Sequence, residues 1–118
     1  MGTYVMVIND SPFQSERAFN ALRLAGVMQE KHPDIRLRLF FLSDGVFSVL
    51  PHQTKPEESP DIEGRLRTLI DHGVEVRACI ICMKDRGLYG RPVIDGVEIG
   101  NLYDLADWVA EADKVLTF

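Results

Sequence analysis

Residues 4–12 read Tyr-Val-Met-Val-Ile-Asn-Asp-Ser-Pro, and this stretch decides the fold class. Its first five residues form a short apolar run rich in β-branched side chains, which is typical of a strand covered on both faces of a sheet. The Asn-Asp-Ser-Pro that follows is typical of a strand-to-helix turn, with Ser11 or Ser15 as the helix cap and Pro12 at the first helical position. An apolar stripe at helical spacing then continues to Pro33. The stretch therefore opens a βα unit.

The same alternation continues along the chain. Further strands are expected at residues 35–42, 74–78, 93–99 (broken by Asp95-Gly96) and 114–118. Further helices are expected at residues 46–50, after Ser59 as the cap with Pro60 at the first helical position and Asp61 as an early acidic charge, and after Asn101. In the last of them Leu102, Leu105, Ala106 and Val109 would face inward. Residues 51–59 carry prolines and polar side chains but no aliphatic one, which indicates an exposed, mobile loop. Alternating strands and helices predict an α/β layer fold with a mainly parallel sheet.

Length and charge exclude several classes of protein. A chain of 118 residues has the size of a single domain, so we expect one domain over residues 1–118. Its net charge of −5 provides no positive field for a phosphate backbone, so we expect no nucleic-acid partner. The beginning of the chain does not resemble a signal peptide, and no apolar run is long enough to span a membrane. With two closely spaced cysteines, we expect a protein of the reducing cytoplasm.

Cys79 and Cys82 hold all the sulfur nucleophiles of the chain, and Cys79 falls at the carboxyl end of the third expected strand. Ligand sites of open α/β sheets lie at such strand ends. If a helical turn begins after Cys79, its free N–H groups would stabilise a thiolate, and Lys84 and Arg86 would add positive potential. Cys82 would then face Cys79 as a resolving thiol. The alternative is that both cysteines are small buried hydrophobic residues, because free cysteine is among the most buried residue types.

A metal or cofactor site finds less support. Two cysteines at this spacing supply half of a tetrahedral zinc site, but His32, His52 and His72 are scattered without ligand spacing. No phosphate-loop pattern occurs. We therefore expect neither a metal nor a cofactor.

Several segments together give the chain a resemblance to a known family. They are residues 9–12 after the first strand, 19–25, 37–44, Cys79-Ile80-Ile81-Cys82 with Asp85-Arg86-Gly87, 94–100 and 112–118. On these segments the chain resembles, nearly from end to end, the DsrE/DsrF-like family of small sulfur-relay proteins and its YchN-like subgroup.

The resemblance implies a three-layer α/β/α fold with a mainly parallel five-stranded sheet, the DsrE/YchN-like fold. It also implies a homohexamer built as a trimer of dimers, together with sulfur donor and acceptor proteins as partners. In relay members of the family, a cysteine after the third strand accepts a persulfide and passes it on. Cys79 matches that position, with Gly87 following it at the family's distance, and Cys82 matches the second cysteine of the subgroup. The apolar side chains of Phe13, Phe47 and Leu88, expected in loops, would be covered by neighbouring subunits.

The leading hypothesis is therefore a sulfur carrier or sulfurtransferase-like protein with Cys79 as the persulfide-bearing nucleophile and Cys82 as an auxiliary thiol. One alternative is a dithiol oxidoreductase, because a Cys-x-x-Cys pair at a helix start is also the thioredoxin arrangement. Against it, the intervening Ile80-Ile81 is bulky, and Ala78 stands where an aromatic residue usually precedes the pair. Another alternative is a noncatalytic assembly module with buried cysteines.

Overall fold

Strands and helices alternate along the chain in the computed structural model, which describes residues 2–118. The elements are β1 (Thr3–Ile8), α1 (Arg17–Lys31), β2 (Arg36–Phe41), the 3₁₀ helix η1 (Ser43–Val49), α2 (Ile62–Asp71), β3 (Glu75–Cys79), α3 (Ile80–Asp85), β4 (Val97–Gly100), α4 (Leu102–Glu111) and β5 (Lys114–Thr117). Four predicted strands are confirmed with their ends shifted by one residue at most, and the strand expected over residues 93–99 forms only at Val97–Gly100. The predicted α/β class is confirmed as well.

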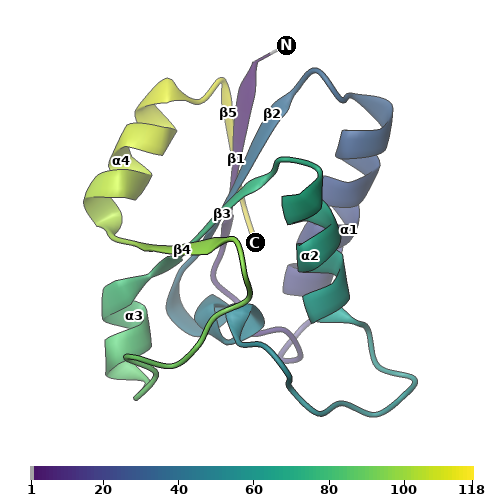
Figure 1. Ribbon diagram of the computed structural model, residues 1–118. Helices are drawn as coiled ribbons and strands as arrows, with labels where there is room; N and C mark the ends of the chain where they lie inside the picture. The colour runs from purple at the N-terminus through teal and green to yellow at the C-terminus, as the bar shows by residue number, and fades with distance from the viewer. Residues whose placement is uncertain (1) are drawn as a thin grey trace.

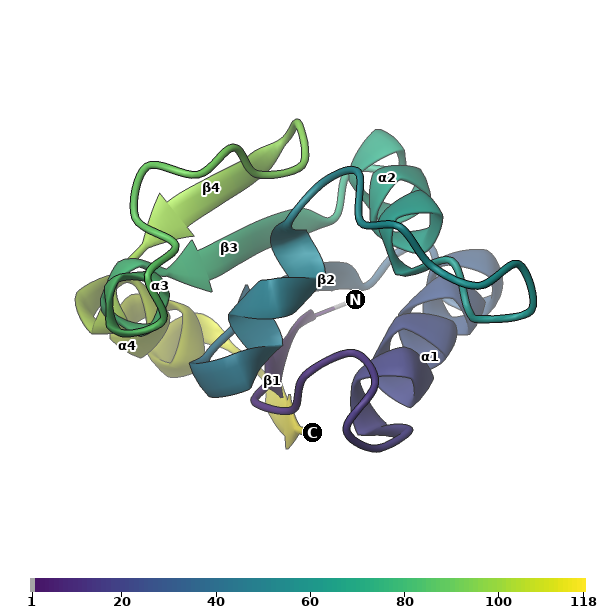
Figure 2. The same ribbon diagram turned by 90° about the horizontal axis from the view of Figure 1, so that it is seen from below.

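The five strands form one sheet in the order β4-β3-β2-β1-β5, and every neighbouring pair is parallel. Figure 1 shows α1 and α2 on one side of the sheet and α4 on the other, which gives the three layers α/β/α. Because the strands are parallel, their carboxyl ends all lie at one end of the sheet, which we call its carboxyl edge, and Figure 2 looks onto this edge. There α3 and η1 lie at one part of the edge, and the loop that leads to α2 projects at the other.

The sheet separates two apolar clusters. The larger one lies between the sheet and α1 and α2, and it includes Met6, Leu22, Leu39, Phe41 and Leu66. The smaller one lies between the sheet and α4 and consists of Val5, Val7, Phe40, Cys79, Leu105 and Trp108. Because both faces of the sheet are covered, β1 is apolar and buried from Val5 to Ile8, as expected for a parallel sheet. Its neighbours β2 and β3 also carry charged residues, among them Arg38 and Arg77.

Two helices begin later than the sequence predicted. Neither Ser11 nor Pro12 starts α1, because the chain turns first and the Ser15 hydroxyl donates to Asp10 (2.6 Å) while accepting the Arg17 N–H (3.2 Å). In α2 the cap is Asp61, whose carboxylate accepts the Gly64 N–H at 2.9 Å, so the prediction of a cap at Ser59 was wrong by two residues. The N-cap position of α1 is Glu16, which makes no side-chain cap bond, so neither Ser11 nor Ser15 caps this helix. Several adjacent residues have cap chemistry before both helices, so composition alone does not fix where the helix begins.

The inward face of α4 was also predicted wrongly, apart from Leu105. Leu105 and Trp108 are buried, whereas Leu102, Ala106 and Val109 are exposed. The Trp108 ring meets Phe40 edge-on at 5.8 Å between ring centroids. The guanidinium groups of Arg38 and Arg77 lie over the same ring, 5.2 and 4.6 Å from its centroid. Arg38 also pairs with Glu111 of α4 at 2.7 Å. These contacts determine the rotation of α4.

Leu88 is buried and Phe47 half-buried, which corrects the prediction that both lie exposed in loops. Gly87, at φ 71°, ends α3 with its N–H bonded to Lys84 O, and the Leu88 N–H bonds to Met83 O at 2.8 Å. This pairing is the Schellman arrangement, which turns Leu88 back onto Met83 in the core. Phe47 lies in η1 and packs against the same cluster. Only Phe13 of the three is largely exposed.

Candidate functional site

Cys79 is the last residue of β3 and the N-cap of α3, so a helical turn begins directly after it, as predicted. Its backbone is extended (φ −69°, ψ 122°), and its sulfur accepts the N–H of Cys82 at 3.4 Å. An N-cap side chain normally satisfies one of the free N–H groups of the first helical turn with an oxygen atom. Here a sulfur atom does so, and this N–H stabilises negative charge on that sulfur.

The two cysteines differ in accessibility. Cys79 is only 3% exposed and lies in the smaller cluster, between the sheet and α4. Cys82 is half-buried and packs against both apolar clusters. Cys82 is therefore the thiol nearer to solvent, and the deeper Cys79 has the strand-end position.

A backbone group from a distant part of the chain meets the Cys82 sulfur. The N–H of Ser43, the first residue of η1, donates to Cys82 Sγ at 3.2 Å. Because β2 and β3 are parallel neighbours, their carboxyl ends lie side by side, and the turn that follows β2 reaches α3. Ser43 has φ 50°, a left-handed conformation that is uncommon for residues other than glycine. The turn after β2 is thus part of the site.

Arg86 provides the positive charge near the pair. Its Nε donates to Asp44 Oδ1 at 2.7 Å, and its Nη1 donates to the Cys82 carbonyl oxygen at 3.1 Å. Lys84, also predicted to add positive potential, instead lies over the Tyr89 ring, 4.7 Å from its centroid. Of the two predicted cations, Arg86 is therefore the one with contacts to the cysteine segment.

Burial and a hydrogen bond with the Cys79 sulfur raise the pKa of the Cys82 thiol. The Ser43 N–H and the charge of Arg86 oppose this rise but do not outweigh it. The hydrogen bond with Asp44 raises the pKa of Arg86, which therefore remains a cation. The folded protein thus holds the Cys82 proton more tightly than an exposed thiol would hold its own.

Both cysteines are free thiols. Within residues 2–118, no group of three His, Cys, Asp or Glu side chains is placed to hold a metal ion. His32 and His72 follow the ends of α1 and α2, and His52 lies in the loop after η1. The structure therefore brings none of the three histidines to the cysteines. In the same part of the chain, no helix is long and apolar enough to cross a membrane.

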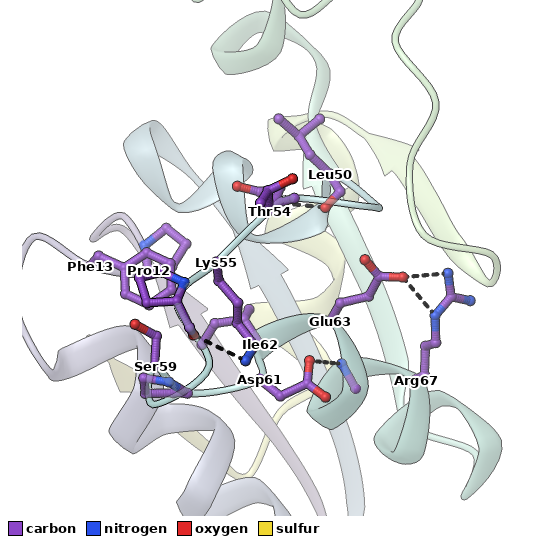
Figure 3. A pocket seen from close by; sticks show the side chains of 14 residues that line it. Pro12, Phe13, Leu50, Thr54, Lys55, Ser59, Asp61, Ile62, Glu63 and Arg67 are labelled. Carbon is purple, nitrogen blue, oxygen red and sulfur yellow. Dashed lines mark hydrogen bonds and ion pairs between the residues drawn. The ribbon is translucent and has the colours of Figure 1, made fainter.

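A hollow of about 530 Å³ lies apart from the thiols, and no cysteine lines it. Figure 3 shows its walls, formed by Pro12 and Phe13 on one side and by the loop before α2 on the other. Its carboxylates already have partners: Asp61 caps α2, and Glu63 pairs with Arg67 at 2.7 Å. The cysteine site is therefore not a deep pocket but a packed edge of the sheet.

Sequence reasoning missed Ser43 and Asp44 as parts of the site. A signal was present, because Ser43-Asp44-Gly45 follows the second strand as a turn, and neighbouring parallel strands end at one edge. The sequence pattern could not show the strand order, in which β2 is the neighbour of β3, the strand that ends in Cys79.

An all-parallel five-stranded sheet with a thiol pair at its carboxyl edge defines a class of small α/β proteins with a strand-end cysteine. The family profile described as the DsrE/DsrF-like family matches residues 3–118, and the chain belongs to this family. It is 46% identical over 118 residues to protein YchN of Escherichia coli K12, covering 100% of both chains. It is 38% identical over 113 residues to an uncharacterized protein of Methanopyrus kandleri, covering 96% of this chain and 91% of that protein.

Solved structures agree with this assignment. The crystal structure of the E. coli ychN protein superposes with a TM-score of 0.93 at 45% identity and 100% coverage of both chains. The structure of a Methanobacterium thermoautotrophicum protein of unknown function gives a TM-score of 0.73 at 17% identity, again over 100% of both chains. The second likeness concerns the fold alone. The DsrE/YchN-like fold predicted from the sequence is confirmed.

Proposed function

We propose that this protein is a sulfur carrier or sulfurtransferase-like protein, with Cys79 as the persulfide-bearing nucleophile and Cys82 as an auxiliary thiol. The observation that carries the proposal is the position of the Cys79 sulfur, which caps α3 and accepts the Cys82 N–H at 3.4 Å. Membership of the DsrE/DsrF-like family supports it, because relay members of this family use a cysteine after the third strand.

The chemistry is a transfer of one sulfane sulfur. The Cys79 thiolate attacks the outer sulfur of a persulfide on a donor protein, a new S–S bond forms on Cys79, and the donor leaves as a thiolate. The Cys82 N–H then remains a hydrogen-bond donor to the Cys79 Sγ. Since Cys79 is only 3% exposed in the single chain and packs with Leu105 and Trp108, loading requires a local opening of α4 away from the sheet.

Mass spectrometry after incubation with a persulfide donor tests the proposal. We expect the wild type and Cys82→Ser to gain the mass of one sulfur at Cys79, and Cys79→Ser to gain none there. A known carrier protein, loaded in parallel, confirms the conditions. If the wild type gains no sulfur while the known carrier does, the proposal is wrong.

A dithiol oxidoreductase is a second candidate, and the placement of both thiols on one helical turn, where the Cys82 N–H donates to Cys79 Sγ at 3.4 Å, favours it. Two adjacent thiols can close into a disulfide while reducing a substrate. Turnover in an insulin-reduction assay with a thiol reductant would support this candidate, and its absence would remove it. If neither cysteine reacts with a small alkylating agent in the native protein, both chemical functions fail, and a noncatalytic module remains.

The proposal also includes partner proteins and the cellular compartment in which the protein acts. Donor and acceptor proteins would exchange sulfur with the site, and the reducing cytoplasm would keep both thiols free. We propose further that the chain assembles into a homohexamer as a trimer of dimers, as the family resemblance implies. Exposed apolar side chains support an assembly, because water-exposed apolar patches are costly unless neighbours cover them. They include Ile81, Ile99, Leu102, Tyr103 and Val109.

A further inference from the structure

Arg86 connects two segments around Cys82 without a hydrogen bond to its sulfur. The Nε atom donates to Asp44 Oδ1 at 2.7 Å, and the Nη1 atom donates to the Cys82 carbonyl oxygen at 3.1 Å. A guanidinium held from two directions has little freedom to move away. Its charge is therefore kept beside Cys82 while only 27% of its side chain is exposed.

The Cys82 sulfur has two further neighbours of chemical importance. Ser43 donates its N–H to the sulfur at 3.2 Å, from a left-handed backbone conformation with φ 50°. The second neighbour is the thiol of Cys79 at the end of β3, whose sulfur accepts the backbone N–H of Cys82 at 3.4 Å. One N–H donor, one held cation and one second sulfur thus surround Cys82.

Few other charged groups face this thiol. On α3 itself, Asp85 acts on Arg86, and Lys84 lies over Tyr89. From η1 comes Asp44, which is paired with Arg86, and β3 contributes the Cys79 thiol. The residues that α4 packs into the cluster with both cysteines are Leu105 and Trp108, which are not titratable. Arg86 is therefore the cation with the clearest means of stabilising a Cys82 thiolate.

We propose that Arg86 is a positioning residue that governs whether a persulfide on Cys79 is kept or resolved. The inference rests on the proposed sulfur-carrier function. In the resolving step, the Cys82 proton first passes to solvent, and the Cys82 thiolate attacks the Sγ of Cys79. A Cys79–Cys82 disulfide forms, the bond from Cys79 Sγ to the protonated outer sulfur breaks, and that sulfur leaves with its proton and the electron pair as hydrosulfide. No external oxidant is needed, because the sulfane sulfur is reduced while the two cysteines are oxidised.

The balance between relay and release then depends on the proton of Cys82. While Cys82 keeps its proton, it is a poor nucleophile, and the persulfide survives for transfer to an acceptor. When Cys82 ionises, the persulfide is lost as hydrosulfide. The Arg86 charge and the Ser43 N–H bring this ionisation to lower pH, against the effects of burial and of Cys79.

The first experiment measures the protonation of Cys82 without any persulfide. In a Cys79→Ser background, the pH dependence of iodoacetamide alkylation reports on Cys82 alone. Arg86→Gln should move the midpoint of this profile up by about 0.5 pH unit, which is about a threefold slower reaction below the midpoint. Arg86→Lys, which keeps the charge, should restore most of the shift. The matched control is Lys84→Gln, which removes a positive charge from the same helix and should leave the midpoint unchanged.

The second experiment measures hydrosulfide release from protein loaded with persulfide at Cys79, at a fixed pH near 8. Arg86→Gln should release hydrosulfide about threefold more slowly than the wild type, and Lys84→Gln at the wild-type rate. Release at an unchanged rate from loaded Arg86→Gln would overturn the inference and leave the carrier function standing. An equal midpoint shift in Arg86→Lys and Arg86→Gln would also overturn it, since the effect would then be structural. If the wild type cannot be loaded at all, the carrier function fails, and the resolving step fails with it.

Discussion

Cys82 couples the chemistry of the site to the stability of the fold. Burial and the hydrogen bond with Cys79 raise the pKa of its thiol, so the folded protein holds this proton more tightly than the unfolded chain. The contribution of Cys82 to stability is therefore complete below the ordinary thiol pKa of about 8.5, and it is lost as the pH rises through the higher pKa of the folded state. We expect the free energy of unfolding, measured with urea under a phosphine reductant, to fall more steeply between about pH 8 and pH 10 in the wild type than in Cys82→Ser. Equal slopes would contradict this expectation.

Gly45 holds η1 against the end of β1. Its N–H bonds to the carbonyl oxygens of Asn9 and Leu42, at 3.0 and 2.8 Å, and a Cβ atom at this position would collide with the carbonyl oxygen of Ile8. A backbone atom cannot swing aside, so Gly45→Ala should destabilise the protein by about 2 kcal/mol or more, measured by urea unfolding.

Gly26 provides the matched control for that substitution. It lies in α1, and a Cβ atom there would meet nothing within 4 Å. Gly26→Ala should therefore stabilise the protein by about 0.5–1 kcal/mol, since alanine is the better helix former. If Gly45→Ala proved as harmless as Gly26→Ala, the close approach of η1 to β1 would be wrong.

At the scale of the elements, the positions of the strands were predictable from the sequence, and the rotation of α4 against the sheet was not. Each strand appears as a local run of apolar, β-branched side chains, so its position follows from neighbouring residues alone. The inward face of α4 depends instead on Trp108 meeting Phe40, a contact between distant parts of the chain. Leu102 and Val109 fit a helical stripe as well as Leu105 does, and only this contact excludes them. The apolar periodicity therefore predicted that α4 is a helix, but not which of its faces packs against the sheet.

The candidate site also has a part that was predictable from the sequence and a part that was not. Cys79, Cys82 and the helical turn between them are local in sequence, and their arrangement could be predicted from a strand followed by a helix start. The Ser43 N–H and the Asp44 partner of Arg86 come from the turn after β2, and only strand order brings them to α3. The sequence pattern located the two thiols but not the Ser43 and Asp44 groups that contact Cys82 and Arg86.

Helix α4 covers Cys79, so loosening this helix should expose the thiol. Trp108 is 3% exposed and lies in the same cluster as Cys79. Trp108→Leu should cost about 3 kcal/mol in unfolding free energy, since it removes an aromatic ring from a packed cluster. It should also increase the rate of Cys79 alkylation relative to that of Cys82, measured by mass spectrometry of the same sample. Asp107→Asn, at an exposed position of the same helix, should change neither quantity. An unchanged Cys79 rate in Trp108→Leu would show that the thiol is reached by another route.

At the scale of the whole molecule, the exposed apolar side chains at the start of α4 provide a test of assembly. Leu102 and Tyr103 are 61% and 85% exposed in the single chain, and Ile99 of β4 lies just before them. If neighbouring subunits cover this region, the wild type should sediment as a hexamer of the 13.3 kDa chain. Leu102→Glu with Tyr103→Glu should then give a lighter species, because the covered carboxylates would lose their hydration. Leu24→Glu with Val27→Glu adds the same charge on α1, where the side chains are 38% and 55% exposed, and should preserve the hexamer. A monomeric wild type would refute the proposed assembly, and a hexameric α4 variant would move the interface away from this helix.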